Sequence, residues 1–267
     1  PVTLPDGSVV RGGDVAVHGG LPITPTPWVI NPDNITGFYE TGTTAINSLS
    51  ISGGGDFGDF RLSVADLRSD SYIPGVNLKR KNLSGKFRFR PTKKLRVNAN
   101  FNYVNSNSDN RPAAGYGSEN IGYSLTAWYG RQSNTESLRD YWQPGLEGNQ
   151  QYSFNYTFFD NPFFILQENR NSFNRDRLFG NLSASYEFSP TLKATIRSGM
   201  DYSDETRQFR RNFSTNRFSQ GGYAENDVFY REVNTDFLLD YRPNLSGNFS
   251  VNLLAGGNRL DQQARNT

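Results

Sequence analysis

The sequence of 267 residues contains no cysteine and only one histidine, His18. A chain without cysteine forms no disulfide bonds, no thiolate metal sites and no thiol nucleophiles. A lone histidine also lacks the further ligands of a zinc site and the partners of a catalytic triad. We therefore expect no enzyme activity, no catalytic residues, no metal site and no cofactor, and we interpret His18 as an ordinary loop residue.

Long apolar runs and a charge excess are also missing. The strongest apolar run is FFIL at residues 163–166, far short of the roughly 20 apolar residues of a membrane-spanning helix. Because lipid accommodates only helices and closed barrels, any part of this chain that crosses a membrane must consist of strands. The net charge is +2 and the charges are well mixed, so no nucleic-acid partner is indicated.

Aromatic residues are abundant although the chain is polar overall. Only 35% of the residues are hydrophobic and the mean hydropathy is −0.67, yet the chain has 20 Phe and 14 Tyr. Disordered chains are poor in aromatic residues, whereas a barrel with one wet face and one lipid face combines both properties. Because the chain starts at Pro1 and stops within a strand-like pattern, we expect an internal segment of a longer protein.

Alternation of apolar and polar residues is the dominant local pattern. In residues 97–103 (VNANFNY) every odd position is apolar or aromatic and every even position is Asn. Strand geometry places these two sets on opposite faces. The pattern predicts about eight strands, at residues 44–53, 60–67, 83–90, 97–103, 181–188, 192–201, 233–242 and 248–253.

The polar side chains of these strands are expected to share one face, which would line the lumen of a barrel. Buried charges on such a face require partners, so these residues serve the structure as readily as they serve function. The set consists of Arg88, Asn98, Asn100, Asn102, Arg197, Asp201, Asp236 and Asp240.

The predicted connections alternate between short and long. Tight turns rich in Gly or Pro are expected at residues 53–56, 90–93, 189–191 and 242–244, because Pro suits a turn and not the middle of a ladder. Long connections are expected at residues 69–79, 105–176 and 203–227. Short turns at one end and long loops at the other are typical of outer-membrane barrels. The all-β alternative is a soluble β-sandwich that serves as a binding or adhesion module, although a loop of about seventy residues is improbable there.

Several short segments together resemble the SusC/RagA family of TonB-dependent outer-membrane transporters. The first group reads NPDNITGFYETG at residues 31–42 and NSLSISGG at residues 47–54, followed by FRLS, IPG and KRKNLS at residues 60–63, 73–75 and 79–84. The second group reads LRDYW, NPFF, NRN and RDRLFG at residues 138–142, 161–164, 169–171 and 175–180. The resemblance rests on their common order over residues 31–203, while residues 204–267 follow the family only in general style.

The resemblance implies an antiparallel transmembrane β-barrel segment, about eight strands of a plugged barrel of 22 strands. Residues 1–42 would connect the plug to the barrel and form the first loop region. Residues 43–267 would form the N-terminal part of the barrel, with a long extracellular loop at about 105–176. The whole protein would lie in the bacterial outer membrane and import oligosaccharides or peptides with a SusD-like surface lipoprotein and the TonB complex. A passive porin-like barrel is the membrane alternative.

The predicted loop at residues 105–176 is rich in aromatic and arginine side chains. Aromatic faces beside Arg donors suit sugar rings, peptides or a protein partner. The same residues could instead form the core of the loop or a belt at the membrane interface, and the sequence leaves both possibilities open. The candidate binding residues are Tyr116, Tyr123, Trp128, Tyr129, Arg139, Tyr141, Trp142 and Arg170.

Overall fold

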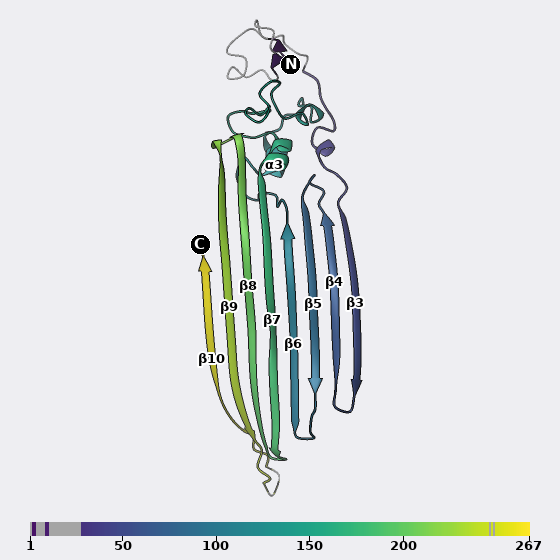
Figure 1. The fold of residues 1–267 in the computed structure, drawn as a ribbon, viewed down its shortest axis with the longest axis vertical. Helices are drawn as coiled ribbons and strands as arrows, with labels where there is room; N and C mark the ends of the chain where they lie inside the picture. The colour runs from purple at the N-terminus through teal and green to yellow at the C-terminus, as the bar shows by residue number, and fades with distance from the viewer. Residues whose placement is uncertain (1, 4–8, 11–27, 246, 248) are drawn as a thin grey trace.

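A computed structural model describes residues 2–3, 9–10, 28–245, 247 and 249–267, so His18 lies outside the described residues. Its main feature is one open sheet of eight antiparallel strands, in which each strand pairs with the next along the chain (Figure 1). The strands are β3 (Thr43–Gly55), β4 (Gly58–Asp70), β5 (Asn77–Phe89), β6 (Leu95–Ser108), β7 (Arg170–Ser189), β8 (Leu192–Thr215), β9 (Phe218–Tyr241) and β10 (Leu253–Asn266). Two short strands, β1 (Val2–Thr3) and β2 (Val9–Val10), pair with each other.

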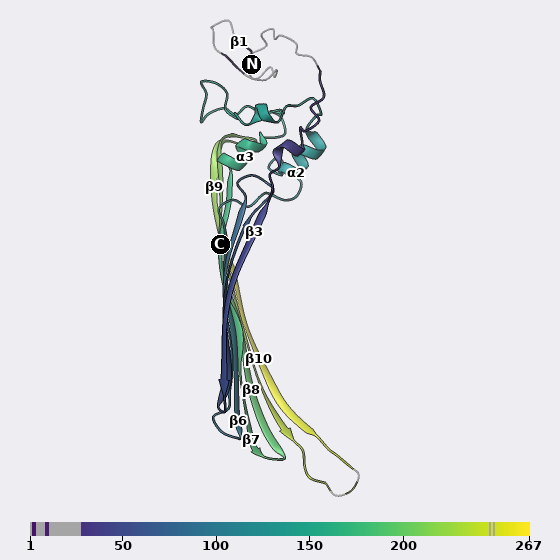
Figure 2. The ribbon, with the colours of Figure 1, turned by 90° about the vertical axis from the view of Figure 1, so that its right-hand side faces the viewer.

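The predicted number of eight strands is confirmed, and seven of the predicted segments correspond to strands. The eighth, residues 248–253, is wrong, because β10 begins only at Leu253. The sandwich alternative is also wrong. A sandwich needs two packed sheets, but among the described residues the eight-stranded sheet is a single layer (Figure 2). Most observed strands are longer than predicted, above all β8 and β9. The fold is therefore an open antiparallel meander whose edges are β3 and β10.

The strand register gives the sheet one polar face. Directly opposite residues in an antiparallel pair lie on the same face, and Arg88 is opposite both Asp59 and Asn98. Farther along the sheet, Arg197 is opposite Asp236, and Arg197 Nε donates to Asp236 Oδ1 at 2.8 Å. The predicted polar set shares this face, as its register places all of its members there.

From β3 to β9 the opposite face carries an apolar band that no described part of the chain covers, whereas on β10 the same face carries Arg259 and Asp261. Large side chains on it are strongly exposed, among them Leu182 at 53%, Ile196 at 54% and Phe237 at 58%. Tyr103 and Tyr202 mark the end of the band nearest the long loop, and directly beyond them the same face carries Asp176 and Asp204. At the other end the band finishes in aromatic residues, namely Phe89, Tyr186, Phe188 and Tyr241.

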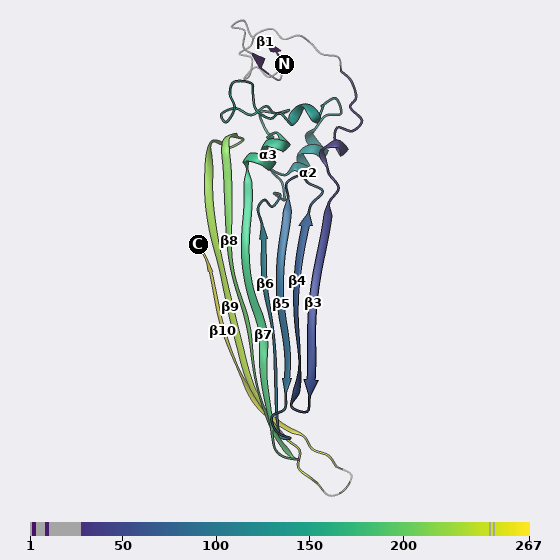
Figure 3. The ribbon, with the colours of Figure 1, turned by 45° about the vertical axis from the view of Figure 1, so that its right-hand side comes forward.

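The buried apolar core lies at one end of the sheet, not on its face. The connection between β6 and β7 folds over this end together with residues 28–42 (Figures 2 and 3). Its short helices are α2 (Ile121–Tyr123), η2 (Ser124–Trp128), η3 (Glu136–Leu138) and α3 (Pro162–Glu168), and η1 (Thr36–Phe38) packs beside them. In the part of the chain that the structure describes, no helix has the length and apolarity needed to cross a membrane.

Two of the predicted connections are wrong. Residues 203–227 were expected to form a long loop, but they belong to β8 and β9 and to the two-residue turn at Asn216 and Arg217. Beyond the apolar band both faces of this hairpin are mostly polar, with isolated aromatic residues such as Phe213, Phe218 and Tyr223, so apolar alternation does not reveal it. Conversely, the link after β9 is not a tight turn at residues 242–244, because β10 begins only at Leu253. The long loop itself spans residues 109–169, somewhat less than the predicted 105–176.

Candidate functional site

The 109–169 loop has its own apolar core. Phe38 and Leu125 are fully buried, and Leu138 is 2% exposed. They pack with the apolar side of α3, including Phe163 and Ile165. A loop of this length would normally be loosely held. This core, contributed partly by the segment before β3, gives the loop a defined shape.

Asn161 connects α3 to the rest of the loop. Its Oδ1 accepts a hydrogen bond from the backbone N–H of Phe163 at 2.8 Å, as an N-cap residue does. Its Nδ2 donates to the backbone oxygens of Leu138 at 2.9 Å and Tyr152 at 2.8 Å. Pro162 follows at the first helical position, where its missing N–H costs nothing. One fully buried side chain thus fixes the helix against two separate loop segments.

The loop is attached to the tip of the β8–β9 hairpin. Gln151 donates from its backbone N to Ser214 Oγ at 3.1 Å and from Nε2 to the Ser214 oxygen at 2.6 Å. The backbone N of Asn216 donates to Asp160 Oδ1 at 2.8 Å. Arg211 and Glu119 form an ion pair below these contacts, with Nη2 and Oε2 2.7 Å apart. The hairpin beyond the apolar band therefore acts as a support for the loop.

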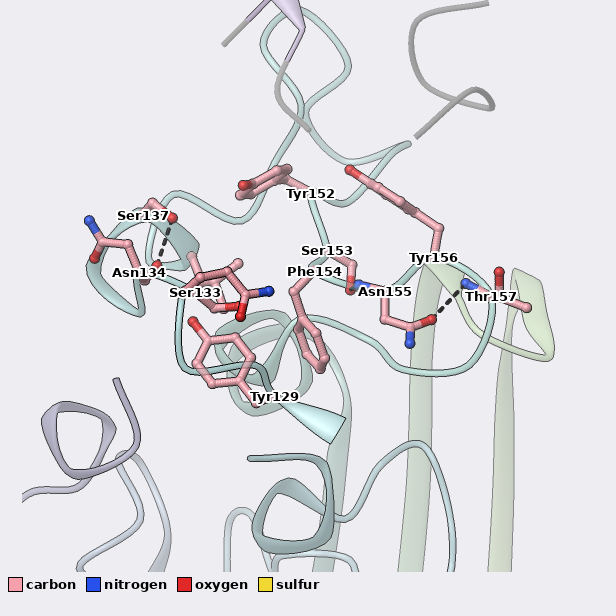
Figure 4. Close-up of a pocket in the computed structure, with 12 residues that line it drawn as sticks. Tyr129, Ser133, Asn134, Ser137, Tyr152, Ser153, Phe154, Asn155, Tyr156 and Thr157 are labelled. Atoms are coloured by element: carbon pink, nitrogen blue, oxygen red, sulfur yellow. Dashed lines mark hydrogen bonds between the residues drawn. The ribbon is translucent and has the colours of Figure 1, made fainter. Parts of the chain in front are cut away.

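A cavity of about 580 Å³ opens between two segments of this loop (Figure 4). The first segment passes through η3, and the second is the run YSFNYT at residues 152–157. Aromatic side chains alternate with hydroxyl and amide side chains along the second segment. The wall consists of Tyr129, Gln132, Ser133, Asn134, Ser137, Leu138, Tyr152, Ser153, Phe154, Asn155, Tyr156 and Thr157.

The wall carries no acidic or basic side chain. Burial raises the pKa of the Tyr129 phenol to about 12, so Tyr129 stays protonated at neutral pH. Asn155 Oδ1 accepts hydrogen bonds from the backbone N–H groups of Thr157 and Phe158, which leaves the Nδ2 hydrogens of Asn155 for a ligand. A cavity of this size, with aromatic faces and neutral donors, fits a sugar unit or a short stretch of peptide backbone.

Among the predicted candidates, Tyr129 lies in the cavity wall. Tyr116, Tyr123 and Trp128 lie outside it, in a chain of ring contacts that includes Phe158 and Phe159. Tyr116 is 91% exposed and Trp128 46%. These three residues form an aromatic surface beside the cavity.

The other candidates hold the loop together or flank it. Tyr141 donates from its hydroxyl to Glu168 Oε1 at 2.9 Å, and Trp142 packs edge-on against Phe164. Arg139 pairs with Glu136 and lies over the ring of Phe163, while Arg170 starts β7 and is exposed. Sequence reasoning did not select Tyr152, Phe154 or Tyr156 as site residues, although the alternation of residues 152–157 was a usable signal.

The fold resembles solved structures of peptide importers. The chain superposes on "Structure of the RagAB peptide importer in the 'closed-closed' state" with a TM-score of 0.64 and 18% identity, over 88% of this chain and 26% of that one. For "Structure of the RagAB peptide transporter" the values are 0.62, 16%, 89% and 26%. For the importer "in the 'open-open' state" they are 0.62, 17%, 88% and 26%. No protein-family model and no curated protein matches the sequence.

At these identities the likeness establishes the fold. The open meander corresponds to a segment of a transporter barrel, and the chain spans about a quarter of the length of those proteins. The predicted fold class, an antiparallel all-β barrel segment, is therefore confirmed. The proteins it resembles are described as a peptide importer and a peptide transporter.

Asp160 lies in the wall of a second cavity, of about 360 Å³, which shares Ser153 and Tyr156 with the first. The side chain of Asp160 is 1% exposed. Its Oδ1 accepts from Gln151 Nε2 at 2.6 Å as well as from Asn216, whereas its Oδ2 has no hydrogen-bond partner among the described residues. Burial raises the pKa of Asp160 to about 6.

This raised pKa predicts that the loop is held more firmly at low pH. Between pH 4 and pH 6 the opened loop loses the Asp160 proton while the closed loop keeps it, so closure weakens as pH rises. The free energy of loop closure should be less favourable by roughly 2–3 kcal/mol at pH 7 than at low pH. After correction for the intrinsic pH dependence of exchange, hydrogen exchange of residues 150–161 should therefore be faster at pH 7.5 than at pH 5. Asp160→Asn should remove this pH dependence of exchange. The control Asp140→Asn, at an exposed residue, should keep it. An unchanged pH dependence in Asp160→Asn would contradict the role given to Asp160.

Proposed function

We propose that this chain forms consecutive strands in the barrel of a SusC/RagA-like, TonB-dependent transporter of a bacterial outer membrane. The observation that carries the proposal is the uncovered apolar band, which faces away from a polar, ion-paired face on the same strands. From Leu192 to Tyr202, β8 rises roughly 34 Å at about 3.4 Å per residue. At the usual strand tilt of 35–45° this gives a band about 24–28 Å tall, close to the hydrocarbon thickness such barrels span.

The parts of the chain then take defined places in the whole protein. Residues 43–267 supply the N-terminal part of the barrel, and residues 1–42 connect it to a plug domain and form the first loop region. The 109–169 loop lies on the extracellular side, since long loops occupy that side in outer-membrane barrels. Energy enters through the TonB complex, and a SusD-like lipoprotein covers the loop side, where the exposed Tyr116 and Trp128 offer aromatic contacts.

The cavity indicates the kind of substrate. Oligosaccharides and peptides are both compatible with the fold, and the similar structures are peptide importers by their own descriptions. The uncharged wall of the cavity favours a neutral ligand rich in hydroxyl or amide groups. A charged peptide terminus would have to be desolvated there without an ionic partner, which is costly. A neutral oligosaccharide is therefore the preferred substrate class at this site.

Replacing Tyr156 in the cavity wall with Ala is expected to weaken substrate binding by roughly 5- to 30-fold. The loss of one aromatic face from a sugar- or peptide-binding site costs about 1–2 kcal/mol. Binding of neutral oligosaccharides and of peptides to the full-length protein, measured by titration calorimetry in detergent, would report this loss. Tyr223→Ala is the matched control, because Tyr223 lies on β9, is 61% exposed and lies outside the cavity wall.

The same variants in cells separate the transporter from a passive porin-like barrel. Uptake of a labelled ligand should stop when the TonB complex is deleted and should fall in Tyr156→Ala cells. Uptake that persists without TonB would favour the passive alternative. Equal binding by wild type and Tyr156→Ala would show that the cavity does not bind the substrate. The assignment as a TonB-dependent barrel would then still be tested by the TonB deletion.

A further inference from the structure

The turn between β5 and β6 is the most basic part of the chain. Within residues 86–96 (KFRFRPTKKLR) there is no acidic residue, and the cations are Lys86, Arg88, Arg90, Lys93, Lys94 and Arg96. This turn lies at the end of the sheet opposite the 109–169 loop, beside the β3–β4 turn (Figures 1 and 3). The two turns are joined by a hydrogen bond from the backbone N of Arg90 to the oxygen of Phe57, 2.6 Å long.

Only some of these cations have a counter-ion. Arg88 Nε lies 2.8 Å from Asp59 Oδ1, and Arg96 Nη2 lies 3.2 Å from Glu187 Oε1. Lys94 reaches only a backbone oxygen. Within the described part of the chain, no ion pair engages Lys86, Arg90 or Lys93. The turn therefore carries a positive charge that the described residues leave unneutralised.

A hollow of about 460 Å³ lies between the two turns. Arg90, Lys93 and Arg96 contribute to its wall, against a single carboxylate, Asp56. The hydroxyl oxygen of Thr92, in the same wall, accepts from two backbone N–H groups, so its own proton can be donated to a ligand. Cations and a hydroxyl donor in this combination can bind phosphate oxygens.

Aromatic side chains place this hollow at the boundary of the apolar band. Phe57 belongs to the wall and is 68% exposed. Phe89 lies outside the wall, on the opposite face of β5 from Arg88, where it ends the apolar band. Aromatic rings of this kind lie at the level of lipid headgroups, with cations just beyond them. A ligand in the hollow would therefore meet charge on one side and apolar surface on the other.

We propose that the hollow between the β3–β4 and β5–β6 turns binds the phosphate headgroup of an anionic phospholipid, such as phosphatidylglycerol or cardiolipin, from the periplasmic leaflet. Arg90 and Lys93 hold the phosphate, and the glycerol and first acyl carbons lie against Phe57. A zwitterionic phosphatidylethanolamine carries its own cation and is a poorer match for this charge. The site requires that the barrel is embedded in a membrane, and it does not depend on what the barrel transports.

Native mass spectrometry of the full-length barrel, purified from an equal mixture of phosphatidylglycerol and phosphatidylethanolamine, tests the site. Wild type should retain phosphatidylglycerol in preference to phosphatidylethanolamine. The double variant Arg90→Gln/Lys93→Gln should retain roughly 25-fold less phosphatidylglycerol, taking about fivefold for each cation near an anionic bilayer. The matched control is Arg210→Gln, an exposed cation in the upper part of β8, which should behave as wild type.

A charge-preserving variant shows whether the Gln substitutions act through the lost charge or through a folding defect. Arg90→Lys/Lys93→Arg should keep the lipid, and its heat-modifiable band on a denaturing gel should match wild type. Equal retention of the two lipids by wild type, or full retention by the double Gln variant, would overturn the proposal. So would a double Gln variant that keeps its lipid but loses the plug from the barrel, since the cations would then serve an acidic protein segment in the lumen.

Discussion

Replacing Leu182 with Arg is expected to destabilise the membrane-embedded barrel by about 2–4 kcal/mol, the cost of a cation on the lipid face near the bilayer midplane. Leu182 lies on the apolar face of β7 and is 53% exposed. It is opposite Ala99 on β6 and Ser198 on β8. No acidic side chain is therefore directly opposite it to neutralise an added guanidinium. Urea titration of the full-length barrel in lipid vesicles would measure the loss.

The preceding residue supplies the matched control. Asn181 lies on the other face, opposite Asn100 and Gly199, where the missing side chain of Gly199 leaves room. Asn181→Arg adds the same charge to the same strand and removes the hydrogen bond that Asn181 Oδ1 accepts from Asn100 Nδ2, so it should lower the free energy of unfolding by only about 1 kcal/mol. Similar losses in both variants would mean that the apolar band does not meet lipid.

The strands could be predicted wherever the two faces of the sheet differ in polarity. Residues 97–103 alternate apolar side chains with Asn because one face carries the apolar band and the other carries hydrogen-bonded polar rows. The pattern fails in residues 203–227, since both faces of the hairpin are mostly polar there, with only isolated aromatic residues, and the strands are held by their ladder and by the loop. Apolar and polar residues alternate in the sequence when the two faces of a strand lie in different environments. A strand with water or polar protein on both faces shows little alternation.

The candidate site was harder to predict because its residues follow no regular spacing in the sequence. The aromatic residues of the loop were recognised as a group, but the group divides between core, exposed surface and cavity according to long-range contacts. Asn161 decides part of this division through hydrogen bonds to Leu138 and Tyr152. The sequence signal for Asn161 was the local Asn-Pro helix start, and nothing local indicates the two distant oxygens.

Replacing Arg211 with Met is expected to release the 109–169 loop from the β8–β9 hairpin, with a loss of about 3 kcal/mol. The side chains of Arg211 and Glu119 are 10% and 20% exposed, and the pair connects β8 to the beginning of the loop. Removing one partner of such a pair leaves the other charge poorly solvated, which is the costly outcome. Glu119 would then also repel Asp160, whose carboxyl it already influences. Hydrogen exchange in residues 119–161 should accelerate by roughly 100-fold.

Two further variants show how the pair acts. Arg210→Met, on the neighbouring exposed residue, should leave exchange in the loop unchanged. Arg211→Met combined with Glu119→Leu should recover most of the protection, because a buried pair replaced by apolar side chains loses its desolvation cost together with its attraction. If the double variant is as open as Arg211→Met, the ion pair itself holds the loop. If it closes again, the polar contacts of Gln151, Asp160 and Asn216 hold the loop, and the role of the pair is to keep either charge from being buried alone.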